Sequence, residues 1–142
     1  MKLLDIAKSY LKQANARLRD AEEASAENLN AYALRLSQEC VELSLKAALK
    51  LVGIEYPKKH DVSDVLIEVK DRFPEWFQKE IRFLADVSRK LAKKREISMY
   101  GDEESFLSPD EAISCEEALK AVEWAKKTHE LCKNLLSAIE HP

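Results

Sequence analysis

Three side chains that could hold a ligand lie close together in the second half of the chain, at Arg95, Glu96 and Tyr100. Glu96 and Tyr100 are four residues apart, so they share one face of a helix. The planar guanidinium of Arg95 suits a phosphate group, because it can donate to two oxygens at once. Lys94 precedes this group with further basic charge. The pattern predicts binding of an anionic ligand, although cations near a helix C-terminus are also favoured by the helix dipole alone.

Arg95 also has an unusual place in the hydrophobic pattern. Apolar residues recur from Phe77 onwards at alternating spacings of four and three, which is typical of the buried face of a helix, and Arg95 continues this series. A buried guanidinium without a partner is strongly unfavourable. We therefore expect Arg95 to pair with a carboxylate of a neighbouring helix or to line a polar cleft. The alternative is that the helix has reached its solvent-exposed end.

A line of charged side chains in an earlier, mostly apolar segment offers partners for Arg95. Its members follow one another at helical spacing between residues 29 and 52, and they are Arg35, Glu39, Glu42, Lys46 and Lys50. Glu42 and Lys46 are spaced for an ion pair with each other. Glu42 or Glu39 is the expected partner of Arg95. The alternative is an exposed edge with weak surface pairs, each worth about 0.3 to 0.5 kcal/mol.

The elements that would position these residues are all helical. Hydrophobic periodicity predicts helices over residues 3–23, 29–52, 74–99 and 109–139, with a short helix after Asp61. Gly53 stands where the helix over residues 29–52 should end, and Gly101 stands where the helix over residues 74–99 should end. Ser108 with Glu111 forms a capping box for the last helix. The expected fold is all-α, an antiparallel up-and-down bundle of four long helices plus a short helix. It forms one domain over residues 1–142.

Composition excludes several classes of protein. The chain of 142 residues has a formal charge of −3, which argues against coating nucleic acid non-specifically. No apolar run approaches the length of a membrane span, and the N-terminus becomes charged too early for a secretory signal, so we expect a cytoplasmic protein without membrane contact. Cys40, Cys115 and Cys132 lack metal-ligand spacing and are expected to be buried thiols. No metal and no cofactor is expected.

Two blocks of this sequence resemble a known family. The run from Arg35 to Leu49, followed by Gly53, Pro57 and Lys59-His60-Asp61, resembles the N-terminal half of HEPN domains. The stretch from Arg95 to Tyr100 resembles the position of the family signature, an arginine and a polar residue followed by a histidine.

This resemblance implies a helical bundle that forms a homodimer, with the signature arginines of two subunits meeting in a shared cleft. Active members of the family resemble metal-independent endoribonucleases, in which the histidine acts on the ribose 2′-hydroxyl and the arginine stabilises the phosphate. Many prokaryotic members resemble toxins that pair with a small nucleotidyltransferase. Other members lack the histidine and resemble binding or scaffold proteins.

The chain departs from the active pattern because Tyr100 stands where the histidine is expected. A phenol is almost wholly protonated at neutral pH, whereas an imidazole is poised for proton transfer. His60 is assigned to the loop after the second helix, His129 to a buried face and His141 to the chain end, so none is expected to replace it. The acidic residues 102–104 would also repel an RNA backbone.

The sequence therefore favours a non-catalytic HEPN-like protein that binds a nucleotide, a phosphate ligand or a partner protein such as a minimal nucleotidyltransferase. One alternative is an endoribonuclease toxin that acts on RNA with Arg95 and an activated Tyr100. Another is a purely structural dimeric bundle. No catalytic residue is assigned, and the candidate ligand-binding residues are Arg95, Glu96, Tyr100, Glu42, Lys46 and Lys94.

Overall fold

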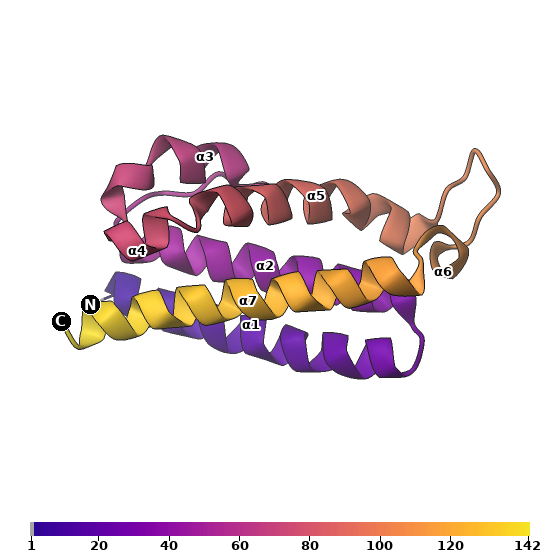
Figure 1. Ribbon diagram of the computed structural model, residues 1–142, viewed down its shortest axis with the longest axis horizontal. Helices are drawn as coiled ribbons and strands as arrows, with labels where there is room; N and C mark the ends of the chain where they lie inside the picture. Colours follow the sequence, from indigo (N-terminus) through magenta and orange to yellow (C-terminus); the bar gives the residue numbers. More distant parts are fainter. Residues whose placement is uncertain (1) are drawn as a thin grey trace.

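Four long helices form an antiparallel bundle in the computed structural model, which describes residues 2–142. They are α1 (Lys2–Ala26), α2 (Asn30–Leu51), α5 (Ile81–Tyr100) and α7 (Cys115–Glu140). Figure 1 shows them side by side along the long axis of the molecule, with both termini at the same end. Residues 2–142 contain no β-strand, and the expected all-α bundle is confirmed.

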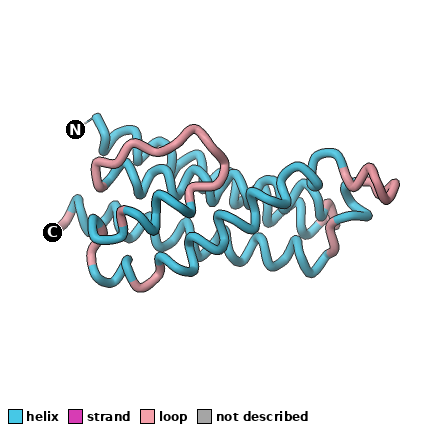
Figure 2. The backbone as a smooth tube through the Cα atoms, turned by 90° about the horizontal axis from the view of Figure 1, so that it is seen from above, coloured by secondary structure: helices cyan, strands magenta, loops and turns pink. Residues whose placement is uncertain are grey.

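Shorter elements lie at the two ends of the bundle. α3 (Ser63–Glu68), a 3-10 turn (Lys70–Arg72) and α4 (Glu75–Gln78) precede α5, and α6 (Pro109–Ala112) precedes α7. Figure 2 shows most of the loops at these ends, whereas the long segment between α2 and α3 runs along the side of the bundle. None of the helices in residues 2–142 is long and apolar enough to cross a bilayer.

The predicted helix that carries Arg95 is interrupted near its start. Sequence periodicity predicts one helix over residues 74–99, but α4 ends at Gln78 and α5 begins at Ile81. Phe77 stacks on Phe73 at a centroid distance of 4.6 Å, and Gln78 Nε2 donates to Phe73 O at 2.8 Å. These contacts hold a tight turn in place of a continuous helix. Phe77 and Ile81 are still both buried, as their spacing predicts.

The last predicted helix is also divided. The capping box of Ser108 and Glu111 starts α6, as expected, but α6 ends after one turn. A second capping box, Ser114 with Glu117, starts α7. Ile113 between them is extended and fully buried. The chain therefore anchors Ile113 in the core and restarts the helix, a break that two successive capping boxes in the sequence could have indicated.

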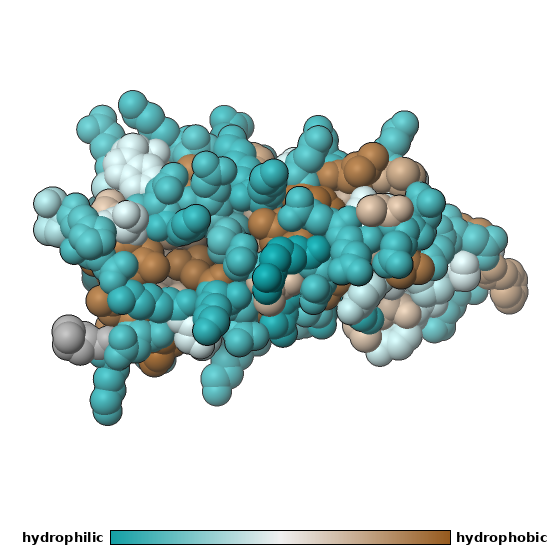
Figure 3. All heavy atoms as spheres, turned by 90° about the horizontal axis from the view of Figure 1, so that it is seen from below, coloured by the Kyte–Doolittle hydropathy of each residue, from teal (hydrophilic) through white to brown (hydrophobic). Residues whose placement is uncertain are grey.

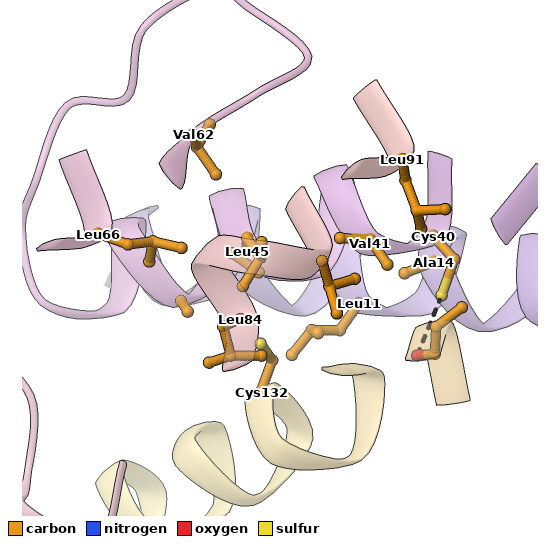
Figure 4. Close-up of a cluster of buried hydrophobic side chains, with 14 of the residues drawn as sticks. Leu11, Ala14, Cys40, Val41, Leu45, Val62, Leu66, Leu84, Leu91 and Cys132 are labelled. Atoms are coloured by element: carbon orange, nitrogen blue, oxygen red, sulfur yellow. Dashed lines mark hydrogen bonds between the residues drawn. The ribbon is translucent and has the colours of Figure 1, made fainter. Parts of the chain in front are cut away.

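α2 is the central element, as its nearly all-round hydrophobicity predicts. It packs against α1, α5 and α7, and 14 of its 22 residues are buried. Figure 4 shows Leu45 and Val41 of α2 among side chains from the other helices, with Cys40 Sγ 3.9 Å from Ala125 O. Burial raises the pKa of the Cys40 thiol to about 12.

Two of the three cysteines are buried as expected, but the third is not. Cys40 and Cys132 lie in the core, whereas Cys115 is exposed. Cys115 is the first residue of α7, directly after its cap Ser114, where the helix begins at the surface. The prediction of a buried thiol is therefore wrong at Cys115.

Candidate functional site

Arg95 is held by the neighbouring helix α2. Its Nη1 donates to Gln38 Oε1 at 2.6 Å and to Glu39 Oε2 at 3.3 Å, and its side chain is 22% exposed. The expectation of a carboxylate partner is thus met by Glu39, and no hydrogen bond or ion pair joins Arg95 to Glu42. Gln38, a buried amide that the sequence did not single out, makes the shorter contact.

A second arginine shares the same carboxylate. Arg17 of α1 places its Nε 3.3 Å from Glu39 Oε1, and its Nη1 donates to Gln13 Oε1 at 3.0 Å. Glu39 therefore lies between two guanidinium groups that come from different helices. No feature of the sequence distinguishes Arg17 from the other basic residues on the polar face of α1.

Glu42 is the centre of the hydrogen-bond network. Its carboxylate accepts from Gln38 Nε2 at 2.9 Å and Lys46 Nζ at 2.8 Å, and it lies 2.7 Å from His60 Nδ1. Burial alone would raise the pKa of Glu42, but the hydrogen bonds from Lys46, Gln38 and His60 outweigh it and lower the pKa below its ordinary value. Glu42 is therefore ionised at neutral pH. Because Gln38 also bonds Arg95, one network joins Arg95 to His60.

The loop that carries His60 is fastened to α5. Asp61 Oδ1 accepts from the Ser63 backbone N–H at 2.9 Å and from Ser88 Oγ at 3.3 Å, and the Val62 N–H donates to Ser88 Oγ at 3.0 Å. Ser88 is the one polar residue before Arg95 in the buried series of α5. It uses that position to fix the loop, and the loop places His60 beside Glu42.

These side chains surround two adjoining hollows. The first, which we call the Arg95 hollow, has a volume of about 190 Å³ and is lined by Arg17, Glu39, Glu42, Leu43, His60 and Arg95. The second, which we call the Tyr56 hollow, has a volume of about 390 Å³ and is lined by Glu42, Lys46, Tyr56, Lys58, Lys59 and His60. Glu42 and His60 belong to both, so the two hollows adjoin at this pair.

The sequence was compared with models of known protein families, and the model of the HEPN domain matches residues 7–135. The chain belongs to the HEPN domain family. The match includes every residue of both hollows. Comparisons with curated proteins and with solved structures gave no match.

The structure of this HEPN domain separates the candidate residues that the sequence grouped. Arg95, Glu42 and Lys46 lie at the two hollows. Glu96 and Tyr100 instead line a separate hollow of about 410 Å³ with the acidic residues 102–104, and Tyr100 is 62% exposed. α5 remains helical from Arg95 to Tyr100, and five helical residues turn the chain by about 140°. Tyr100 therefore does not share the Arg95 hollow.

Lys94 belongs to neither group. Its Nζ lies 3.0 Å from Glu117 Oε2 of α7, on the flank of α5 that faces that helix. Among residues 2–142 there is also no group of three metal-ligating side chains that could hold an ion.

His60 is the residue whose place at the site the sequence did not predict, although it belongs to the block that carries the family resemblance. The sequence places it in a loop, and nothing in the spacing shows that the loop folds back onto α2. The adjoining Asp61 was recognised as a helix-start residue, and its cap fixes the backbone next to His60. His129 was expected to be a hydrogen-bonded core or interface residue, and it is buried with Nε2 3.2 Å from Leu11 O.

Proposed function

We propose that this HEPN domain binds a nucleotide or another phosphate-bearing ligand at the Arg95 and Tyr56 hollows. The observation that carries the proposal is the sharing of Glu39 by Arg17 and Arg95 at the wall of one hollow. A guanidinium has five N–H donors, and Glu39, Gln13 and Gln38 engage only part of them. The remaining donors suit phosphate oxygens.

The charge of the joined hollows favours an anion. Five cationic side chains and two carboxylates line them, whereas the whole chain has a formal charge of −3. Lys46 and Lys50 lie 5.0 and 5.2 Å from the centre of the Tyr56 ring, a cation–π arrangement that keeps both ammonium groups next to the hollow. Lys46 is thus held in place before a ligand arrives, which reduces the entropy lost on binding.

Titration calorimetry with AMP, ATP, inorganic phosphate and adenosine tests this function. We expect heat from the phosphate-bearing compounds and none from adenosine. Arg17→Gln should weaken binding about tenfold or more, because a hydrogen bond to a charged group contributes about 1.5 to 3 kcal/mol. Arg89→Gln is the matched control, since Arg89 lies on α5 in an exposed pair with Asp86 and lines neither hollow. No heat from any phosphate compound at millimolar concentration would refute the proposal.

The contact between Glu42 and His60 favours a second candidate, metal-independent cleavage of RNA. The carboxylate engages Nδ1 at 2.7 Å, which leaves Nε2 of His60 for proton transfer beside two arginines. His60 would take the proton of a ribose 2′-hydroxyl, the 2′-oxygen would attack phosphorus, and the 5′-oxygen would leave as a hydroxyl that takes a proton from a solvent water, while His60 returns its proton to the solvent. The product would be a 2′,3′-cyclic phosphate.

A cleavage assay on single-stranded RNA decides between binding and catalysis. If this HEPN domain is an enzyme, His60→Gln should abolish cleavage, while Tyr100→Phe should leave it unchanged because Tyr100 lies outside the hollow. Cleavage that disappears in Tyr100→Phe and persists in His60→Gln would contradict the role of His60. An unmodified chain that binds nucleotide and leaves RNA intact would establish the binding function alone.

A further inference from the structure

A groove runs along the surface between α5 and α7. Both helices pack along α2 (Figure 1), but they approach each other closely at only a few positions. The space between them has a volume of about 400 Å³, and Leu34 of α2 contributes to its floor together with Leu91 and Trp124. We call this feature the α5–α7 groove. It shares no lining residue with the Arg95 hollow or the Tyr56 hollow, so what it binds does not depend on the proposed function.

The α5–α7 groove is apolar inside and basic at its rim. Almost all of the surface that lines it is apolar, although most of the lining residues are charged. A lysine can line an apolar space with its methylene chain while its ammonium group stays in water. Four lysines and two glutamates leave the rim with a net charge of +2, whereas the whole chain has a charge of −3. The charged lining residues are Lys90, Lys93, Lys94, Lys120, Glu116 and Glu117.

Two contacts between α5 and α7 fix the register of the rim. Lys94 Nζ lies 3.0 Å from Glu117 Oε2, and Lys90 Nζ lies 5.6 Å from the centre of the Trp124 ring. The helices are antiparallel, so Lys90, one turn from Lys94, faces Lys120 across the groove. The ion pair neutralises Lys94 and Glu117.

The other lysines of the rim keep their charge available. Among residues 2–142, no ion pair engages Lys90, Lys93 or Lys120. Glu116 lies one helical turn before Lys120 without pairing to it, in the first turn of α7. The rim therefore attracts an anion most strongly between Lys90 and Lys120, away from that first turn.

The size and shape of the groove favour a small aliphatic ligand. Pockets for small molecules have volumes of about 300 to 1,000 Å³, and an apolar cavity of about 150 Å³ holds one benzene. The α5–α7 groove thus has room for an apolar body more than twice as large. The ammonium group of Lys90 lies over the Trp124 ring, which leaves less of that face for a stacked aromatic ring. A flexible chain can instead follow the floor.

Exposed apolar residues elsewhere lack this combination of a hollow and a basic rim. Figure 3 shows hydrophobic atoms near the end of the bundle that holds the termini, and Leu3, Ile6 and Ile139 are exposed in the segments that form this end. They line none of the hollows described above. Leu3 therefore provides a control for contact with an exposed apolar side chain outside a groove.

We propose that the α5–α7 groove reversibly binds a medium-chain aliphatic monocarboxylate such as decanoate. The chain would lie along Leu34, Leu91 and Trp124, and the carboxylate would meet the ammonium groups of Lys90 and Lys120. The groove lies on the flank of α5 that faces α7, whereas Arg95 faces α2. One ligand therefore binds per chain, whatever the number of chains in the assembly.

Titration calorimetry of the full chain with hexanoate, octanoate and decanoate is the first test. We expect one decanoate per chain, with a dissociation constant on the order of 0.1 millimolar. Each added methylene should tighten binding about twofold to fourfold, because full burial of a methylene corresponds to about fourfold and the groove is open on one side. Octan-1-ol, which lacks the charge, should bind about threefold or more weakly than octanoate.

Charge variants locate the carboxylate. Lys90→Glu combined with Lys120→Glu should weaken decanoate binding about tenfold, because two attractive contacts become repulsive. Lys126→Glu combined with Lys133→Glu is the matched control, since both lysines are exposed on α7, line no described hollow and change the net charge equally. The control and Leu3→Ser should both bind decanoate like the parent.

Trp124 reports binding at the groove itself. In a Trp76→Phe background, Trp124 is the only tryptophan, and its emission should shift to shorter wavelength as decanoate covers it. Saturating AMP should leave the decanoate titration unchanged, because the groove and the two hollows share no residue.

Four results would overturn the proposal. The first is the absence of heat and of a Trp124 shift with decanoate at millimolar concentration. The second is equal binding by the two double lysine variants, or binding that Leu3→Ser abolishes. The third is an affinity that falls as the protein concentration rises, which would mean that a second copy of the chain covers the groove. The fourth is a chain that ignores free decanoate but sediments with phosphatidylserine vesicles through Lys90 and Lys120, which would assign these lysines to a membrane surface.

Discussion

The two flanks of α5 hold their charges in different ways. At the Arg95 hollow, Glu42 has three polar partners and Glu39 has two, and the groups come from α1, α2, α5 and the His60 loop. On the other flank, between α5 and α7, Lys94 forms one ion pair that is about half exposed. Lys90 lies there 5.6 Å from the centre of the Trp124 ring. The charges at the hollow are therefore held by a connected network, whereas those on the flank facing α7 have fewer partners.

Removal of Glu42 tests this contrast and should have the largest effect on stability. We expect Glu42→Ala to lower the free energy of unfolding by about 2 to 4 kcal/mol, because Lys46, only 11% exposed in its side chain, loses its carboxylate partner. Urea unfolding followed by circular dichroism measures the change.

Glu117→Ala supplies the control from the other flank. It removes the half-exposed pair with Lys94, and since Glu117 also caps α7, we expect a loss of about 1 kcal/mol. Equal losses in the two variants would show that the hollow is no more tightly held than the groove, and the comparison would fail.

Substitution of Gly101 by alanine tests the close backbone approach in the hairpin of residues 101–108, and the same substitution at Gly53 is its control. Both have positive φ, but a Cβ at Gly101 would clash with the backbone oxygen of Leu107, whereas nothing lies within 4 Å of one at Gly53. We expect Gly101→Ala to cost about 2 kcal/mol and Gly53→Ala about 1, because only the first adds a backbone clash to the strain of positive φ. Thermal melts of both variants measure the difference. A loss at Gly53 that equals or exceeds that at Gly101 would contradict the close approach.

The pairing of Arg95 with Glu39 should have an intermediate strength. Both side chains are about one quarter exposed, so the pair is neither desolvated nor free in water. A double-mutant cycle of Arg95→Ala and Glu39→Ala should give a coupling energy of about 1 kcal/mol. A cycle of Arg89→Ala and Asp86→Ala, an exposed pair on α5, should give less. A coupling of zero in the first cycle would leave Gln38 as the effective partner of Arg95.

The sequence predicts the fold more completely than the site because the two depend on different information. Hydrophobic periodicity identifies the buried faces, so α2 is correctly central and Phe77 and Ile81 are correctly buried. Periodicity does not detect a turn that preserves the apolar series, and so the break between Gln78 and Ile81 was missed.

The candidate site shows the same limit. Arg95 could be found because a charge interrupts an apolar series, and that signal lies within one helix. His60 was noticed in the family block but set aside as a loop residue, because its position beside Glu42 depends on a loop that Asp61 and Ser88 fasten across the bundle. Tyr100 was grouped with Arg95 because both belong to the stretch that resembles the family signature, and helical rotation separates the two in space.

The smallest expected effect is a pH dependence of the unfolding free energy that the Glu42 carboxylate causes. Folding lowers the pKa of Glu42. Its contribution to stability is therefore complete at a pH above its pKa in the unfolded chain, and it is lost as the pH falls through its pKa in the folded protein. The difference in unfolding free energy between the parent and Glu42→Gln should therefore be constant from about pH 7 to 5 and should narrow below about pH 4.3. Urea unfolding at a series of pH values measures this difference. Glu22→Gln, at an exposed position of α1, serves as the control and should show a flat difference. A difference for Glu42→Gln that widens in acid would mean that the network holds the protonated carboxyl group, and the account of Glu42 as the ionised centre of the hollow would be wrong.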